Sequence, residues 1–224
     1  MENANAFMSS SVFRAGGPAT DPRWQTTLLE QPGRSDHIAV VYQDEDFLVK
    51  SAGRFIASGL RSGDGIVVLC TLPHWEMIRE RLAGVDLVSA TRRGQLVRSG
   101  VHNILLGWMS ANCDQAEFDE AVGGLVDAQL GQYAAVRVFS ELADLLLEKD
   151  NRLIATNAQR AWNSYLRGKQ ASVLSPWRLG SLYSEGYSTR IARLYFMHSH
   201  ILTDDNGALP GLMAQPGSGN ALAR

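Results

Sequence analysis

Several apolar runs of this sequence are followed directly by polar and aromatic side chains that could bind a small molecule. Thr71, His74 and Trp75 come after one such run, and Glu141 comes after another. Indole, phenol and imidazole rings with a single carboxylate suit a partly apolar small molecule better than a phosphate. The candidate ligand site consists of Tyr42, Thr71, His74, Trp75, Glu141 and Trp177.

Most of these residues also have a plainer structural interpretation. Trp75 at a helix start could be a core anchor, and Glu141 could simply complement a helix dipole. His37 opens the first apolar run and is a secondary candidate, although a turn residue bonded to a backbone carbonyl would look the same. Cys70, with His74 four residues on, is the best nucleophile and base pair, because a helix start favours the thiolate. The alternative is a small buried hydrophobic residue.

Metal and serine chemistry have little support in the sequence. His198 and His200 share a face only in a strand, and the nearest carboxylates are Asp204 and Asp205. Structural zinc normally needs four ligands. Ser140 lacks the flanking glycines of a nucleophile elbow. We therefore expect no metal and no cofactor.

Two kinds of segment alternate along the chain: continuous apolar runs, and stretches in which apolar residues recur at helical spacing. Continuous apolar runs predict buried strands at residues 37–42, 66–70, 95–97, 134–139 and 171–174. Helical spacing predicts helices at residues 44–59, 75–82, 86–93, 114–130 and 150–167, whereas residues 191–202 fit a helix or a strand. Strands separated by helices pair in parallel through right-handed crossovers. The fold prediction is α/β, a three-layer α/β/α sandwich with a mainly parallel sheet, whose ligand crevice lies beyond the carboxyl ends of the strands.

Composition bounds the organisation of the chain. The 224 residues suffice for one full-sized domain with tails, which we place at residues 36–203. Residues 1–35 and 204–224 are expected to be flexible tails, with a short helix at 24–29 left open. Removal of residues 1–34 and 207–224 should therefore leave the melting temperature nearly unchanged. The two cysteines do not indicate a disulfide scaffold.

Charge and hydropathy exclude some classes of partner. The net charge of −2 offers no general attraction for nucleic acid. The sequence lacks a run of about 20 apolar residues, which a membrane span requires. The first residues carry neither a basic nor an apolar signal region, so we expect a cytoplasmic protein.

Short motifs around the strands resemble those of the MEDS domain, the sensory domain of methanogens and methylotrophs. They are His37 and Tyr42 at the ends of the first strand, Gly59-Leu60 with Gly63-Asp64 before the second, Gly94-Gln95-Leu96 before the third, Tyr133 to Val138, and His198 to Ile201. The resemblance implies a ligand-sensing module with a RecA-like fold related to circadian-clock ATPases. It also implies signalling through a partner protein.

The residues themselves argue against ATP hydrolysis. Residues 71–76 contain neither the glycines nor the lysine of a phosphate loop, and Pro73 removes an amide donor. Ser140 stands where such ATPases place a metal-binding aspartate before the catalytic glutamate. We predict a non-catalytic sensory domain that binds a small molecule and signals through a protein partner. A degenerate nucleotide-binding or thiol-dependent enzyme, a pure interaction module and a homo-oligomer remain alternatives.

Overall fold

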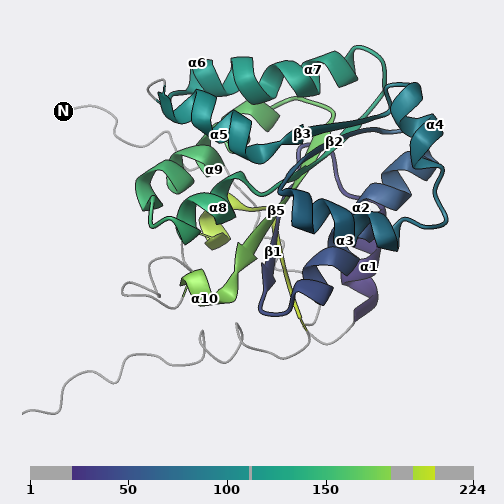
Figure 1. Cartoon of the computed structure of the whole chain (residues 1–224), viewed down its shortest axis with the longest axis horizontal. Helices are drawn as coiled ribbons and strands as arrows, with labels where there is room; N and C mark the ends of the chain where they lie inside the picture. The colour runs from purple at the N-terminus through teal and green to yellow at the C-terminus, as the bar shows by residue number, and fades with distance from the viewer. Residues whose placement is uncertain (1–21, 111–112, 183–193, 205–224) are drawn as a thin grey trace, which may run out of the picture.

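The computed structural model describes residues 22–110, 113–182 and 194–204 (Figure 1). Its strands are β1 (His37–Tyr42), β2 (Gly65–Cys70), β3 (Leu96–Gly100), β4 (Val136–Ser140), β5 (Ala171–Arg178) and β6 (His200–Thr203). Its helices are α1 (Pro22–Glu30), α2 (Glu45–Ser62), α3 (Leu72–Arg81), α4 (Leu87–Arg92), α5 (Val101–Ser110), α6 (Gln115–Phe118), the π-helix η1 (Asp119–Gly123), α7 (Gly124–Leu130), α8 (Leu142–Glu148), α9 (Arg152–Leu166) and α10 (Leu179–Leu182). Within these ranges, no helix is both long and apolar enough to cross a membrane.

The six strands form one sheet in the order β3-β2-β4-β5-β1-β6, and every neighbouring pair is parallel. Ile38 of β1 stands opposite Leu174 on one side and His200 on the other. β1, β2 and β4 are buried along their whole length. The prediction of a parallel α/β sheet built from continuous apolar runs is confirmed.

Two helical layers cover the sheet (Figure 1). Ile38, Val40 and Tyr42 of β1 belong to one core, which also contains residues of α1, α2, α3 and α4. Ala39 and Val41 belong to a second core, with residues of α5 and of the helices from α6 to α9. Successive residues of a strand point to opposite faces, so the alternation places a separate core on each side of the sheet. The three-layer sandwich predicted from the sequence is confirmed.

Helix α2 follows Asp44, whose carboxylate accepts a hydrogen bond from the amide of Asp46. It ends at Gly63, which adopts the left-handed conformation with φ 82°. The sequence prediction that Gly59 ends the helix is wrong. A Cβ atom at Gly59 would lie 2.7 Å from Cδ of Arg137 and from Cδ1 of Ile66. This glycine, in the interior of α2, therefore lets the side chains of two strands pack closely against the helix.

Other boundaries were also missed. Helices α5 and α8 were not predicted, and β5 runs on to Arg178. The segment at 191–202, which fitted a helix or a strand, leads into β6.

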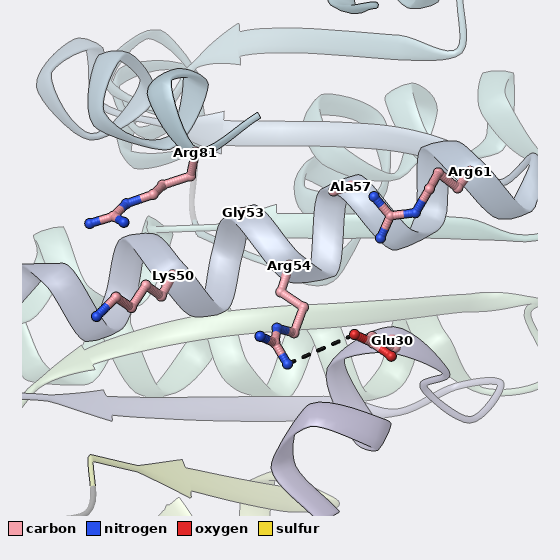
Figure 2. A pocket seen from close by; sticks show the side chains of 7 residues that line it. All are labelled: Glu30, Lys50, Gly53, Arg54, Ala57, Arg61 and Arg81. Carbon is pink, nitrogen blue, oxygen red and sulfur yellow. Dashed lines mark ion pairs between the residues drawn. The ribbon is translucent and has the colours of Figure 1, made fainter. Parts of the chain in front are cut away.

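The exposed side of α2 carries the side chains of Lys50, Arg54 and Arg61 (Figure 2).

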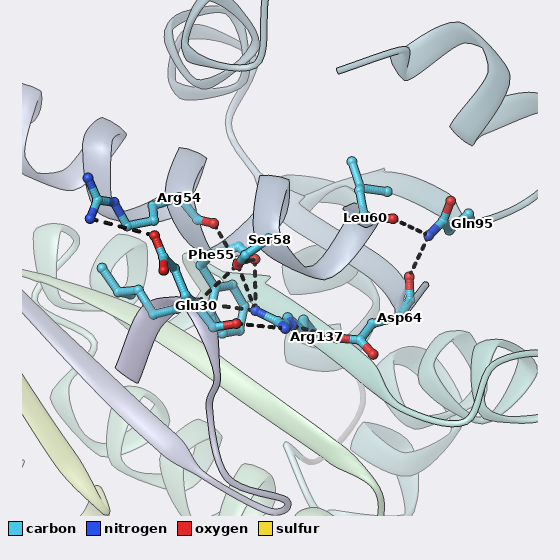
Figure 3. A network of polar contacts seen from close by, with 9 residues as sticks. Glu30, Arg54, Phe55, Ser58, Leu60, Asp64, Gln95 and Arg137 are labelled. Atoms are coloured by element: carbon cyan, nitrogen blue, oxygen red, sulfur yellow. Dashed lines mark hydrogen bonds and ion pairs between the residues drawn. The ribbon is translucent and has the colours of Figure 1, made fainter. Parts of the chain in front are cut away.

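The expectation that residues 1–35 form a flexible tail is wrong over the part that the structure describes. Residues 22–30 form α1, which packs on α2 and buries Leu29. Buried Arg137 of β4 donates hydrogen bonds to the carbonyl oxygens of Leu29 and Glu30, each at 3.1 Å, and to the hydroxyl of Ser58 at 2.9 Å (Figure 3). Residues 1–21 and 205–224 lie outside the described residues.

Candidate functional site

The connections that follow the neighbouring strands β2 and β4 diverge at the carboxyl ends of these strands. After β2 the chain crosses the face covered by α3 and α4, whereas after β4 it crosses the opposite face through α8 and α9. The connections therefore diverge where Thr71 and Glu141 follow two adjacent strands. Such a divergence is the usual ligand-binding position in open α/β sheets.

Glu141 is the centre of the polar contacts at this edge. Its side chain is 1% exposed. Oε2 accepts a hydrogen bond from the amide of Thr71 at 2.8 Å, and Oε1 lies 2.6 Å from Nδ1 of His74. The hydrogen bond to Glu141 and its negative charge raise the pKa of His74 above its ordinary value, although partial burial opposes them. The contact with Glu141 therefore favours the protonated imidazole of His74.

A second polar group lies at the carboxyl ends of β1 and β5. The hydroxyl of Tyr42 donates to Oδ2 of Asp144 at 2.7 Å, and the amide of Arg178 donates to Oδ1 at 2.8 Å. The guanidinium carbon of Arg178 lies 5.1 Å from the centre of the Tyr42 ring. Burial raises the pKa of Asp144 to about 6, against the lowering effect of these two hydrogen bonds. Burial, together with the charge of Asp144, raises the pKa of Tyr42.

Glu45 connects the two groups. Its Oε1 lies 3.1 Å from Nη2 of Arg178 and 4.0 Å from Nε2 of His74. Arg178 also approaches Glu148, with its Nε 3.3 Å from Oε1. Glu45 is exposed, and Thr71 and His74 are half-buried, so the cluster reaches the surface at these residues. The result is a polar rim in which histidine and arginine alternate with carboxylates.

Sequence reasoning did not place Asp144 and Arg178 in the site. Asp144 belongs to an acidic stretch of the sequence, residues 141–150, which would be expected to face solvent, but it is 4% exposed. Its position three residues after Glu141, on one face of the following helix, was the available signal. Arg178 needs the register of β5 against β1, which the sequence does not supply.

Cys70 and Trp75 lie beside the cluster with different environments. The argument that the helix start activates the Cys70 thiol is wrong, because burial and the charge of Glu141 raise its pKa. Nδ1 of His74 contacts Glu141. The Trp75 ring is partly buried against the core, and the guanidinium carbon of Arg98 lies 5.9 Å from its centre. Trp75 is therefore a partly exposed anchor of α3, adjacent in sequence to His74.

The structure separates His37 and Trp177 from the other candidates. His37 opens β1, at the amino end of the sheet, and its ring nitrogens contact Oδ1 of Asn163 at 2.8 Å and Oγ of Ser175 at 3.0 Å. Burial lowers the pKa of His37 to about 4. Trp177 packs on the face opposite Tyr42, beside a cavity of about 60 Å³ and edge-on to His198. These two side chains belong to the core under α8 and α9.

The loop after β2 offers a poor cradle for phosphate. Pro73 lies in the first turn of α3, and the amide of Thr71 already binds the carboxylate of Glu141. A phosphate placed there would lose that donor and meet a buried negative charge. In the part of the chain that the structure describes, no three His, Cys, Asp or Glu side chains gather closely enough to hold a metal ion.

The fold and the edge cluster define a doubly wound parallel α/β domain with a polar rim where its connections diverge. A family model described as "MEDS: MEthanogen/methylotroph, DcmR Sensory domain" matches residues 36–198. The chain therefore belongs to the MEDS family of sensory domains, as its motifs suggested. A comparison with curated proteins found no match.

Proposed function

We propose that this sensory domain binds a small molecule at the rim formed by Thr71, His74, Trp75 and Glu141, performs no catalysis, and signals through a partner protein. Tyr42, Asp144 and Arg178 support the rim from β1, α8 and β5. The proposal combines the sensory character of the family with the chemistry of the carboxyl edge.

The buried carboxylate of Glu141 is the observation that carries the proposal. Removing a charge from water is costly unless hydrogen bonds and an opposite charge compensate. Thr71 and His74 supply that compensation. An apolar residue could fill this position without the cost, and clusters of ionisable groups with shifted pKa values concentrate at functional sites. A ligand with a hydrogen-bonding group for His74 and an apolar part for Trp75 fits the rim.

An enzyme is the second candidate, because the pair of His74 and Glu141 has the geometry of a base oriented by a carboxylate. A nucleophile next to it would be needed. The raised pKa of Cys70 keeps its thiol protonated. The hydroxyl of Ser140 is buried. These features favour binding without turnover.

A thermal-shift screen with nucleotides and partly apolar small molecules tests the ligand site. A ligand that binds the native state raises the melting temperature. We expect that shift to disappear in His74→Ala and to persist in His102→Ala, a matched change at an exposed histidine on α5. Trp75→Ala should weaken binding by about 1 to 3 kcal/mol if the ring is covered by the ligand. A shift that survives His74→Ala and Glu141→Gln would contradict the site.

Incubation with ATP and Mg²⁺ tests the absence of catalysis. We expect phosphate release no greater than from denatured protein. Release that is clearly above this blank and is lost in Glu141→Gln would show instead that the rim is an active site.

A further inference from the structure

A groove of about 420 Å³ lies on the surface where α2 meets the ends of α1 and α3, away from the rim (Figure 2). Four of its lining side chains are cations, namely Lys50, Arg54, Arg61 and Arg81. Gly53 and Ala57, which are both buried, complete its lining.

Three of the cations lie along one side of a single helix. Lys50, Arg54 and Arg61 are four and seven residues apart on α2, and this spacing keeps them on a common face. Eleven residues of helix span about 16 Å. The charges therefore form a line that matches about three turns of a helix laid alongside α2.

The positive charge is only partly compensated. Lys50 and Arg81 share the carboxylate of Asp46, and Nη1 of Arg54 lies 3.8 Å from Oε1 of Glu30. Arg61 has no ion pair with any residue in the described ranges. Four cations thus face two carboxylates, in a chain whose net charge is −2. The groove is a local positive patch on a weakly acidic protein.

The composition of the groove favours an acidic protein segment over other anions. The carboxylates of Glu30 and Asp46 stand among the cations and would repel a continuous phosphate backbone. The large exposed apolar side chains of the described residues, such as Leu72 and Phe196, do not line the groove, which argues against membrane insertion. Discrete carboxylates at helical spacing would match the separated cations.

Two helices lead from the ligand rim to this groove. Helix α3 begins beside Thr71 and His74 and ends at Arg81. Helix α2 begins at Glu45, which pairs with Arg178, and carries the line of cations. The helices touch where a Cβ atom on Gly53 would lie 3.0 Å from Cβ of Arg81. We infer that the groove is the output surface of the domain and docks an acidic helix of the signalling partner; this inference rests on the proposed sensory function.

Fluorescence anisotropy with a labelled helical peptide tests the docking. The probe carries glutamates at positions i, i+4, i+7 and i+11, and a permuted peptide of the same composition gathers them at one end. We expect the spaced peptide to bind and the double variant Arg54→Glu, Arg61→Glu to bind at least about tenfold more weakly. The matched control is Arg160→Glu, Arg167→Glu, which makes the same charge change at exposed residues of α9 and the residue after it. Melting temperatures establish that all variants are folded.

Three results would overturn the docking surface. They are no binding of the spaced peptide, equal losses in the groove and α9 variants, or equal affinity for the permuted peptide. Tighter binding of duplex DNA or of anionic vesicles, with the same dependence on Arg54 and Arg61, would also overturn it. The peptide assay contains no small molecule, so its failure is distinct from failure of the ligand screen. If a ligand binds at the rim but the spaced peptide does not bind, the docking proposal is refuted and the proposed ligand site stands.

Discussion

The Nη1 atom of Arg137 lies 3.1 Å from the carbonyl oxygen of Leu29, which joins the middle of the sheet to the end of α1. The same guanidinium pairs with Asp64, with its Nε 2.7 Å from Oδ2 (Figure 3). A buried arginine needs all of these acceptors, because an uncompensated guanidinium would be strongly destabilising. Helix α1 is therefore part of the folded domain, although it precedes the residues matched by the family model.

Deleting residues 1–34 should lower the free energy of unfolding by about 3 kcal/mol or more. The deletion exposes the apolar surface that Leu29 covers, and it removes two carbonyl oxygens that accept hydrogen bonds from Arg137. Urea denaturation measures the change. Arg137→Met should destabilise the full chain to a similar degree, whereas Arg160→Met, at an exposed position, should have little effect. A deletion variant as stable as the full chain would show that α1 contributes nothing.

Gly59→Ala should destabilise the domain by about 1 to 3 kcal/mol, because the new methyl group would meet Arg137 and Ile66. Gly124→Ala is the matched control. It is also a helical glycine, but an added Cβ there meets nothing within 4 Å, so we expect a gain of up to about 1 kcal/mol. Equal effects of the two substitutions in thermal melts would contradict the packing explanation.

NMR titration should find the pKa of His74 above 6.5, and Glu141→Gln should lower it by removing the main stabilising hydrogen bond. Because the folded-state pKa is raised, the stability contributed by the pair is fully present below pH 6.5 and is lost as pH rises through the folded-state pKa. An unchanged His74 titration in Glu141→Gln would contradict the pairing.

Acid should destabilise the domain through His37 and His198, whose rings lie 4.3 Å apart. Burial lowers the pKa of His37 to about 4 and lowers that of His198 as well. The unfolded chain then takes up protons below pH 6.5 that the folded chain does not, so stability falls as pH drops from 6.5 to 4. For His37 alone the loss between pH 7 and pH 5 is about 2 kcal/mol.

The contribution of His37 can be isolated by comparing how the free energy of unfolding changes with pH in His37→Gln and in the unmodified chain. Asp144, with a pKa raised to about 6, acts in the opposite direction, because its folded form keeps a proton that the unfolded form loses above pH 3.8. His37→Gln removes one histidine and leaves Asp144 unchanged. Its free energy of unfolding should therefore fall less between pH 7 and pH 5 than that of the unmodified chain. Identical slopes would show that the pKa of His37 is the same in the folded and the unfolded chain, and would contradict the lowered pKa.

The sequence predicted the sheet well, because β1 and β2 are uninterrupted apolar runs that suit only strands covered on both faces. It left a short helix open at residues 24–29 but could not predict that α1 is anchored to the domain, because the anchoring depends on backbone carbonyl oxygens and a distant arginine rather than on a long apolar stripe. Gly59 illustrates a further limit. A glycine that ends a helix and one that admits a neighbouring side chain look the same in sequence.

The candidate site was predicted only in part, because the sequence indicates which residues follow strands but not the register of the strands. Thr71, His74 and Glu141 meet because β2 and β4 are neighbours, and residues after adjacent parallel strands must lie close together. Trp177 was included by its position at a strand end, but β5 pairs it with Val41, whereas Arg178 pairs with Tyr42. Paired residues point to the same face, so only the register separates Trp177 from the rim.

Helix α3 is a single element of ten residues, about 15 Å long, with His74 near one end and Arg81 at the other. Arg81 is also the point where α3 touches α2, because a Cβ atom on Gly53 would lie 3.0 Å from Cβ of Arg81. A tilt of about 5° about this contact would displace the His74 end by about 1 Å over that length. A change at His74 would therefore load the contact between Arg81 and α2 without requiring the sheet to rearrange.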